Sequence, residues 1–209
     1  MKKGTTKKTP PKSNWPIWAA IAGVLVIAIA IVVFAGGKKQ PAANGDSYTA
    51  KIEIENYGTI TVALDGEAAP ETVENFVTLA NEGFYDGLTF HRIMEGFMMQ
   101  GGDPNGNGTG GSDKNIKGEF AANGVDNPLS HTRGAISMAR SQMYDSASSQ
   151  FFIVHKDSTF LDGNYAVFGY VTDGIEIVDE ICTGSQPIDN NGTILAEEQP
   201  VIKTITIME

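Results

Sequence analysis

The sequence has a single cysteine, Cys182, among its 209 residues. No disulfide can therefore form within the chain, and thiolates cannot assemble a zinc site, so the expected role of Cys182 is packing. No cysteine directly follows the apolar run near the amino terminus, which disfavours a lipoprotein. Histidine is also scarce, and His91, His131 and His155 show neither helical ligand spacing nor a metal-binding motif. We expect no metal site.

Motifs of several other enzyme classes are missing. There is no G-x-S-x-G sequence, which disfavours a serine hydrolase. The run GNGTGG at 106–111 lacks the lysine and the strand-to-helix context of a phosphate-binding loop. We interpret it as flexible backbone beside a groove, and we expect no cofactor.

Acidic residues are absent from the first 45 positions. All 25 lie at Asp46 or later, whereas 7 of the 15 basic residues lie at or before Lys39. The remainder of the chain carries 8 basic against 25 acidic residues, a net charge of −17. Such a surface makes nucleic acid a poor partner.

One long apolar run precedes the acidic part. Ile17–Ala35 contains 19 residues without a charge, and as a helix it would span about 28 Å, close to the roughly 30 Å hydrocarbon core of a bilayer. A cleaved secretory signal is the competing interpretation, since small residues lie at Ala35 and Gly36. Secretory apolar segments usually have about 7–15 residues, so the length favours an uncleaved signal-anchor helix that crosses the membrane.

The lysines around this run predict its orientation. Five lysines lie in the leader, residues 1–16, and only Lys38 and Lys39 follow the run, so the positive-inside rule keeps the amino terminus in the cytoplasm. Trp15 and Trp18 fit an aromatic belt at that boundary. After a polar linker, residues 36–47, we expect one extracytoplasmic domain over residues 48–209. The protein would be a single-pass cell-membrane protein, or a secreted one if the anchor is cleaved.

The acidic part alternates apolar with polar residues, as strands do. Tyr48–Glu55 and Gly58–Leu64 have period two around a turn at Asn56–Gly58. Pro70–Leu79 has apolar residues at helical spacing, and a second helix is expected around Ile175–Ile181. Further strands are predicted at Thr89–Ile93, Phe97–Gln100, Ala135–Ala139, Gln150–Val154, Ala166–Val171 and Val201–Met208. Short strands with glycine- and asparagine-rich loops favour an antiparallel barrel, with a sandwich as the alternative.

One stretch, Phe90–Gly111, combines side chains that suit a binding site. Arg92 supplies a permanent cation, Phe97 and Met98 are large and apolar, and Gln100 adds an uncharged amide. Strict alternation would place Phe90 with Arg92 on one pleat face, and Met98 with Gln100 on the face opposite Phe97. The inventory suits an apolar, uncharged substrate that carries a polar amide.

Five motifs follow one another along the chain. They are FHRIMEGFMMQGGD with GTGG after it, SMAR at Ser137–Arg140, SQFFI at Ser149–Ile153, FLDG at Phe160–Gly163 and VFG at Val167–Gly169. Together they resemble the cyclophilin family of peptidyl-prolyl isomerases, and the similarity extends from about Tyr48 to Met208. The resemblance implies a mostly β fold, an eight-stranded antiparallel barrel capped by two helices, with its substrate groove on the outer wall. It also implies cofactor-free rotation of the peptide bond before proline.

The resemblance also implies roles for individual residues. Arg92 matches the arginine on which catalysis depends, and its permanently protonated guanidinium could donate to the twisting amide. Gln100, which would hold substrate backbone, and Phe97 complete the catalytic set. The other matches are substrate-binding positions, namely Met98, Ala139, Arg140, Gln150, Phe152, Phe160, Leu161 and Tyr165. Read without the family, the apolar side chains among these residues are more often barrel core than pocket.

Three of these residues depart from the pattern of many eukaryotic members. Phe160 replaces a tryptophan, which puts tight binding of the inhibitor cyclosporin in doubt. Tyr165 replaces a histidine and changes the available hydrogen bonding. Arg140 replaces an asparagine, which adds charge beside the groove while leaving the backbone contact. All three substitutions are familiar among bacterial relatives.

Two functions are compatible with the sequence. The first is an isomerase that assists the folding of exported proteins at X–Pro bonds. The second is a chaperone or scaffold module that only binds proline-containing peptides. Retention of Arg92 favours the enzyme, because binding of proline alone requires no cation at the amide. The expected partners are proline-containing polypeptides and, through the amino-terminal helix, the membrane; nothing demands more than a monomer.

Overall fold

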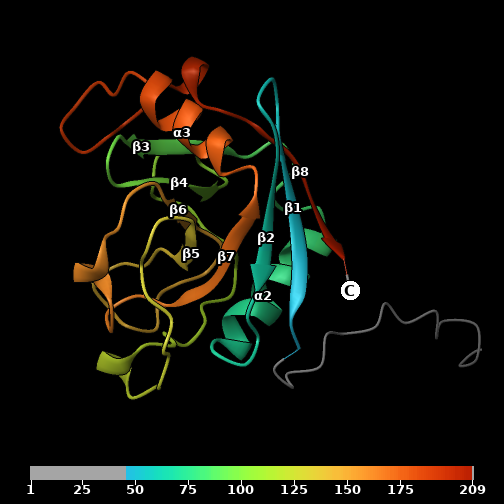
Figure 1. The fold of residues 1–209 in the computed structure, drawn as a ribbon, viewed down its shortest axis with the longest axis vertical. Coiled ribbons are helices and arrows are strands. Elements are labelled where there is room, and N and C mark those ends of the chain that lie inside the picture. Colours follow the sequence, from blue (N-terminus) through green and yellow to red (C-terminus); the bar gives the residue numbers. More distant parts are fainter. Residues whose placement is uncertain (1–45, 209) are drawn as a thin grey trace, which may run out of the picture. The chain divides into compact units, whose positions relative to one another are not determined.

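The computed structural model describes residues 46–208, which form an eight-stranded antiparallel sheet with two α-helices (Figure 1). The strand order is β3-β4-β6-β5-β7-β2-β1-β8. The two edge strands meet through a bridge between Thr89 in β3 and Val201, directly before β8, so the sheet closes on itself as a barrel. The predicted antiparallel strands and two helices are confirmed.

The elements follow the predicted positions closely. The strands are β1 (Tyr48–Ile54), β2 (Gly58–Leu64), β3 (Thr89–Met94), β4 (Met98–Asp103), β5 (Ala135–Met138), β6 (Phe151–Val154), β7 (Val167–Asp173) and β8 (Ile202–Met208). The α-helices are α2 (Pro70–Asn81) and α3 (Ile175–Gly184), and short 3-10 helices occupy Ala121–Asn123, Thr159–Leu161 and Ala196–Glu198. The predicted leader, membrane-spanning run and nearly all of the linker lie outside the described residues. Within residues 46–208 no helix is long and apolar enough to cross a membrane.

The hairpin of β1 and β2 shows why alternation predicts strands here. Ala50, Ile52 and Ile54 of β1 are buried on one face, as the apolar positions of the pattern require. The turn between the strands places Asn56 at φ 66° and Gly58 at φ 124°, conformations that asparagine and glycine tolerate better than other residues.

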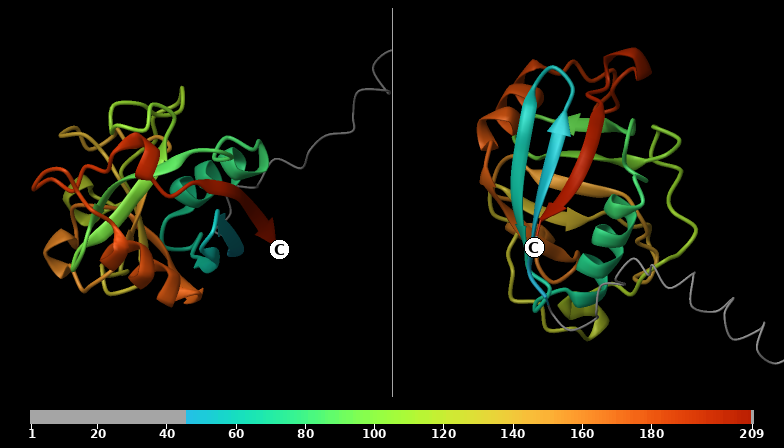
Figure 2. Two further views of the ribbon diagram at one scale, coloured as in Figure 1. Left: turned by 90° about the horizontal axis from the view of Figure 1, so that it is seen from above. Right: turned by 90° about the vertical axis from the view of Figure 1, so that its right-hand side faces the viewer.

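Helix α2 covers part of the barrel interior. Its Phe76 lies in the main core, where its ring centroid is 5.2 Å from that of Tyr85 and 5.5 Å from that of Phe151. The carboxylate of Glu119 accepts the backbone N–H groups of Glu71 and Thr72, which satisfies donors that the first turn of a helix leaves free. Figure 2 shows α2 and α3 on different sides of the barrel.

The outer face of the sheet carries a second, smaller apolar cluster. Its buried members are Met98, Ala135, Phe152, Val154 and Val167, which come from β4, β5, β6 and β7. Partly buried side chains from the segments between the strands pack against this outer cluster, among them Phe97, Leu161 and Tyr165. An apolar surface on the outside of a barrel is available for binding.

Candidate active site

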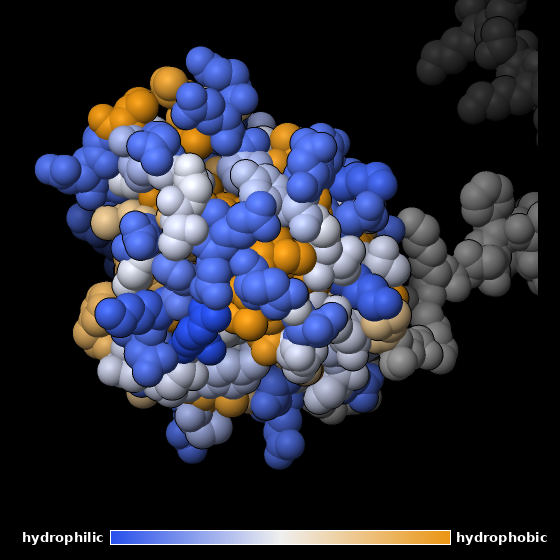
Figure 3. Space-filling view, turned by 45° about the horizontal axis from the view of Figure 1, so that its top comes forward, coloured by the Kyte–Doolittle hydropathy of each residue, from blue (hydrophilic) through white to orange (hydrophobic). Residues whose placement is uncertain are grey.

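The outer wall of the barrel carries a groove made of two adjoining cavities. The first has a volume of about 230 Å³, lies over the outer cluster, and is lined by Arg92, Phe97, Met98, Gln100, Ala139, Arg140, Phe152, Leu161 and Tyr165. The second has a volume of about 360 Å³ and is lined mainly by hydroxyl groups, amides and glycine backbone. Gln100, Ala139 and Arg140 line both. Figure 3 shows apolar side chains in recesses between hydrophilic ones on one face of the molecule.

Most of the residues predicted from the sequence meet in the first cavity. Nine of the eleven line it, and Gln150 lines the second cavity instead. Phe160 lines neither: its side chain is 73% exposed, and its ring lies 5.7 Å from that of Phe97 as an apolar rim. The sequence analysis missed the polar wall of the second cavity, made by Thr109, Ser112, Asn115, Ser141, Ser146 and Ser148.

The prediction from strict alternation was wrong about which side chains share a face of the strand in this part of the chain. Phe90 and Arg92 were expected on one face, but Phe90 is fully buried in the main core while Arg92 lines the cavity. The register of β3 against β4 shifts between these two residues, so an irregularity separates them. Phe97 lies before β4 begins, and for that reason it lines the same cavity as Met98 rather than the opposite face.

The guanidinium of Arg92 is held by uncharged acceptors. Nε donates to the carbonyl oxygen of Asn191 at 2.7 Å, and Nη1 donates to Oε1 of Gln100 at 3.3 Å. Nη1 and Nη2 also contact the sulfur atoms of Met98 and Met94 at 3.7 and 3.3 Å. One N–H of Nη2 has no partner within residues 46–208. Burial lowers the pKa of Arg92, but an arginine remains protonated at neutral pH.

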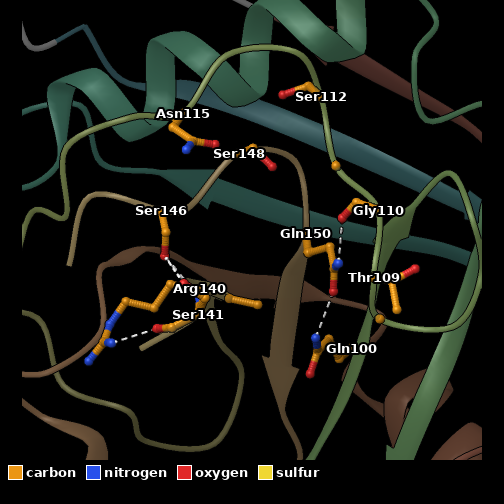
Figure 4. Close-up of a pocket in the computed structure, with 13 residues that line it drawn as sticks. Gln100, Thr109, Gly110, Ser112, Asn115, Arg140, Ser141, Ser146, Ser148 and Gln150 are labelled. Carbon is orange, nitrogen blue, oxygen red and sulfur yellow. Dashed lines mark hydrogen bonds between the residues drawn. The ribbon is translucent and has the colours of Figure 1, made fainter. Parts of the chain in front are cut away.

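A chain of amide hydrogen bonds connects the two cavities (Figure 4). Nε2 of Gln100 donates to Oε1 of Gln150 at 2.9 Å, and Nε2 of Gln150 donates to the carbonyl oxygen of Gly110 at 2.7 Å. Since Oε1 of Gln100 accepts from Arg92, both ends of this amide are fixed in orientation. The side chain of Gln100 is thereby held between the two cavities.

Phe152, in the floor of the first cavity, rests on a buried histidine. The ring of His131 stacks on Phe152 with centroids 5.9 Å apart, while Nδ1 lies 2.8 Å from Asp162 Oδ1 and Nε2 lies 3.0 Å from Ser137 Oγ. Burial lowers the pKa of His131 and outweighs Asp162, which acts to raise it. Hydrogen bonds from Ser130 and His131 hold the pKa of Asp162 below its ordinary value, although its own burial acts to raise it. Ser137 is fully buried, so this Ser-His-Asp arrangement supports the floor rather than acting as a nucleophile.

Arg140 braces the wall between the cavities. In Figure 4 its guanidinium points away from Gln150 and Thr109. Its Cζ lies over the ring of Tyr165 at 4.6 Å from the centroid, and Nε and Nη2 donate to the carbonyl oxygen of Asn164 at 3.0 and 2.8 Å. The side chain therefore fixes a wall of the first cavity, and Arg140 also lines the second.

Tightly packed glycines form the opposite side of the second cavity. A Cβ atom on Gly111 would collide with Oγ of Ser148, and one on Gly110 would collide with Asp103. Close packing therefore requires glycine at both positions, and the lack of side chains there leaves space in the cavity beside Gln150.

Most of the chain resembles one family of known proteins. The family model described as cyclophilin type peptidyl-prolyl cis-trans isomerase/CLD matches residues 49–208. The chain is 50% identical over 131 residues to peptidyl-prolyl cis-trans isomerase B of Bacillus subtilis, covering 63% of this chain and 88% of that protein. It is 39% identical over 165 residues to peptidyl-prolyl cis-trans isomerase A of Dickeya dadantii, covering 75% and 83%.

A similar solved structure is that of a Cryptosporidium parvum cyclophilin type peptidyl-prolyl cis-trans isomerase in the presence of the dipeptide Ala-Pro. The two structures have a TM-score of 0.68 and 30% sequence identity, and the match covers 77% of this chain and 99% of the other.

Proposed function

The chain belongs to the cyclophilin-type peptidyl-prolyl cis-trans isomerases, a family of enzymes, and we propose that it binds proline-containing polypeptides with the proline ring in the first cavity. The observation that carries this proposal is a guanidinium at the edge of an apolar cavity whose lining contains no acidic side chain. Arg92 is therefore a cation without a carboxylate partner there, and its charge is available to a substrate.

Rotation about an X–Pro bond needs no nucleophile. The barrier of about 18–20 kcal/mol comes from amide resonance, and it falls when the nitrogen becomes pyramidal and more basic. The N–H of Arg92 Nη2 that has no partner within residues 46–208 can donate to that nitrogen, while the first cavity holds the ring. Because this interaction strengthens only as the bond twists, it accelerates rotation rather than tightening ground-state binding.

The chain flanking the proline would extend along the groove. Gln100, fixed by Arg92 and Gln150, presents its amide where substrate backbone passes between the cavities. Ala139 and Arg140 line both cavities, and their backbone would meet the extended peptide. The polar second cavity would hold a side chain that flanks the proline.

We propose from the sequence that residues 17–35 anchor the enzyme in the cell membrane and that it assists the folding of exported proteins outside the cytoplasm. The lysine-rich leader supports this orientation. Protease added to intact cells should digest residues 46–209 if the domain is exposed, and protection of the domain in intact cells with digestion only after lysis would contradict the orientation.

The activity is tested by cis-to-trans conversion of a short X–Pro peptide by the full chain. Arg92→Ala should lower kcat/KM by at least about 10-fold, since a hydrogen bond from a charged group is worth roughly 1.5–3 kcal/mol. The matched control is Arg133→Ala, because Arg133 makes a two-point ion pair with Asp179 at 2.7 and 2.8 Å and lines neither cavity.

Two results would change the assignment of roles. If the parent binds the peptide but does not accelerate conversion, the groove is a binding module. If activity follows a bell-shaped pH profile with a histidine pKa, instead of staying flat between about pH 6 and 9, a general acid or base takes part and the role of Arg92 is wrong.

A further inference from the structure

Two thioethers lie against the guanidinium of Arg92. Sδ of Met94 is 3.3 Å from Nη2, and Sδ of Met98 is 3.7 Å from Nη1. Methionine sulfur is an uncharged and weak hydrogen-bond acceptor. The two sulfur atoms therefore orient the cation without neutralising it, whereas a carboxylate in the same place would form an ion pair and compete with the substrate.

The two methionines differ in how an oxidant can reach them. Met98 is 1% exposed in the floor of the first cavity, whereas Met94, at the end of β3, is only partly buried. Its Cγ packs so closely on Gly192 that a Cβ there would collide with it. The neighbouring Asn191 supplies the carbonyl oxygen that accepts from Nε of Arg92. Met94 thus lies between solvent, the catalytic cation and the loop that fixes it.

We propose that Met94 is a modification site at which a hydroperoxide inactivates the isomerase. The sulfur lone pair attacks an oxygen of hydrogen peroxide, the O–O bond breaks, and an S–O bond forms. The sulfur loses two electrons and the peroxide gains them, and the leaving hydroxide takes the proton of the new S–OH group, which gives water and the sulfoxide. This inference rests on the proposed role of Arg92.

The product changes the acceptor beside Nη2. A sulfoxide oxygen is polar and accepts a hydrogen bond from a cation far more strongly than a thioether does. It therefore engages the N–H groups of Nη2, including the one reserved for the substrate amide, and draws the guanidinium away from Gln100. Because the proline cavity itself is unchanged, kcat falls more than KM rises.

Four of the five other methionines within residues 46–208 supply the controls; the fifth, Met208, is partly buried at the end of β8. Met98, Met99 and Met138 are at most 2% exposed, so they are protected in the folded protein. Met143 is 68% exposed and lines neither cavity, so it oxidises readily without touching Arg92. Met143→Leu should therefore leave both the activity and its sensitivity to peroxide unchanged.

The experiment treats the full chain with hydrogen peroxide and follows kcat and KM on an X–Pro peptide, while mass spectrometry locates added oxygen. The parent and Met143→Leu should lose about 10-fold or more in kcat/KM, the size expected when a charge-assisted hydrogen bond is misdirected. Met94→Leu should start within about 5-fold of the parent, as for one weak hydrogen bond, and should then resist peroxide. Met94→Gln, which puts an amide oxygen near the sulfur position, should resemble the oxidised enzyme without treatment.

Each other outcome overturns the inference. The inference fails if peroxide inactivates Met94→Leu as fast as the parent. It also fails if Met143 is oxidised while Met94 is not, or if the parent keeps its activity after Met94 has been oxidised. Methionine sulfoxide reductase should restore the treated parent, and no recovery after reduction of Met94 would also contradict it. Failure of the proposed function is seen separately, because it would appear as a lack of activity in the untreated chain.

Discussion

The buried hydrogen bonds of His131 allow a quantitative test of how the floor of the first cavity is supported. His131→Phe keeps a ring of similar shape against Phe152 but removes both ring nitrogens. The hydroxyl of Ser137 is fully buried and loses its only hydrogen-bond partner among residues 46–208, at a cost of roughly 1–3 kcal/mol. Asp162 adds little, because its side chain is 36% exposed and keeps its bonds from Ser130 and the backbone of His131.

A substitution of Ser137, the hydrogen-bond partner of His131, tests whether the two residues depend on each other. Ser137→Ala leaves Nε2 of His131 without its partner and should cost a similar amount, about 1–3 kcal/mol. The double variant removes both groups, so no buried polar atom of this pair is orphaned. Its loss of stability should therefore be smaller than the sum of the two single losses by about 1 kcal/mol or more.

Urea unfolding of the parent and the three variants at pH 8, where the buried histidine is neutral, measures these free energies. The expected result is a clearly non-additive cycle. Strict additivity would refute the reasoning, since it would mean that neither group depends on the other. The isomerase activity of His131→Phe should stay close to that of the parent, because the ring under Phe152 is preserved.

Three further predictions follow from single features. Burial lowers the pKa of both His91 and His131 in the folded chain, so as the pH falls these histidines are protonated in the unfolded chain before they are in the folded chain. The midpoint of urea unfolding should therefore move to lower urea concentration as the pH drops below about 6.5. A midpoint that moves to higher urea concentration between pH 7.5 and 5.5 would contradict this prediction. Gly111→Ala should raise KM for a longer peptide that fills the second cavity, but not for a substrate of dipeptide length. The control is Gly184→Ala, because a Cβ atom added at Gly184 meets no other atom. Equal changes in KM for both substrates would argue against a substrate role for the second cavity. Phe160→Trp should strengthen cyclosporin binding in a calorimetric titration, and an unchanged affinity would remove Phe160 as the reason for weak binding.

The secondary structure was predictable from the sequence wherever one face of a strand is buried and the other is exposed to solvent. In β1 and β2 the period of two follows directly from that difference, and the apolar spacing of α2 comes from its single buried side. In β3 the same rule failed. The irregularity between Phe90 and Arg92 depends on pairing with β4, and an isolated strand carries no sign of it.

The site was predictable through its motifs and less so through its geometry. Family motifs gave the lining of the first cavity, but they did not reveal that Phe160 lines neither cavity. His131, Ser137 and Asp162 are far apart in sequence, and only packing brings them together. Met94 could have been found, because it stands two residues after Arg92, and in this regular part of β3 alternation places both side chains on one face.

The register of the barrel has a consequence for biosynthesis. β1 pairs with the last strand, β8, so that Thr49 lies opposite Met208. β8 begins directly after Val201, whose bridge to Thr89 closes the barrel. Until β8 has been synthesised, β1 has an open edge and the barrel has a gap. Contacts between such distant segments form slowly, and open strand edges invite aggregation. A nascent copy of this isomerase therefore exposes that edge until its eighth strand is complete.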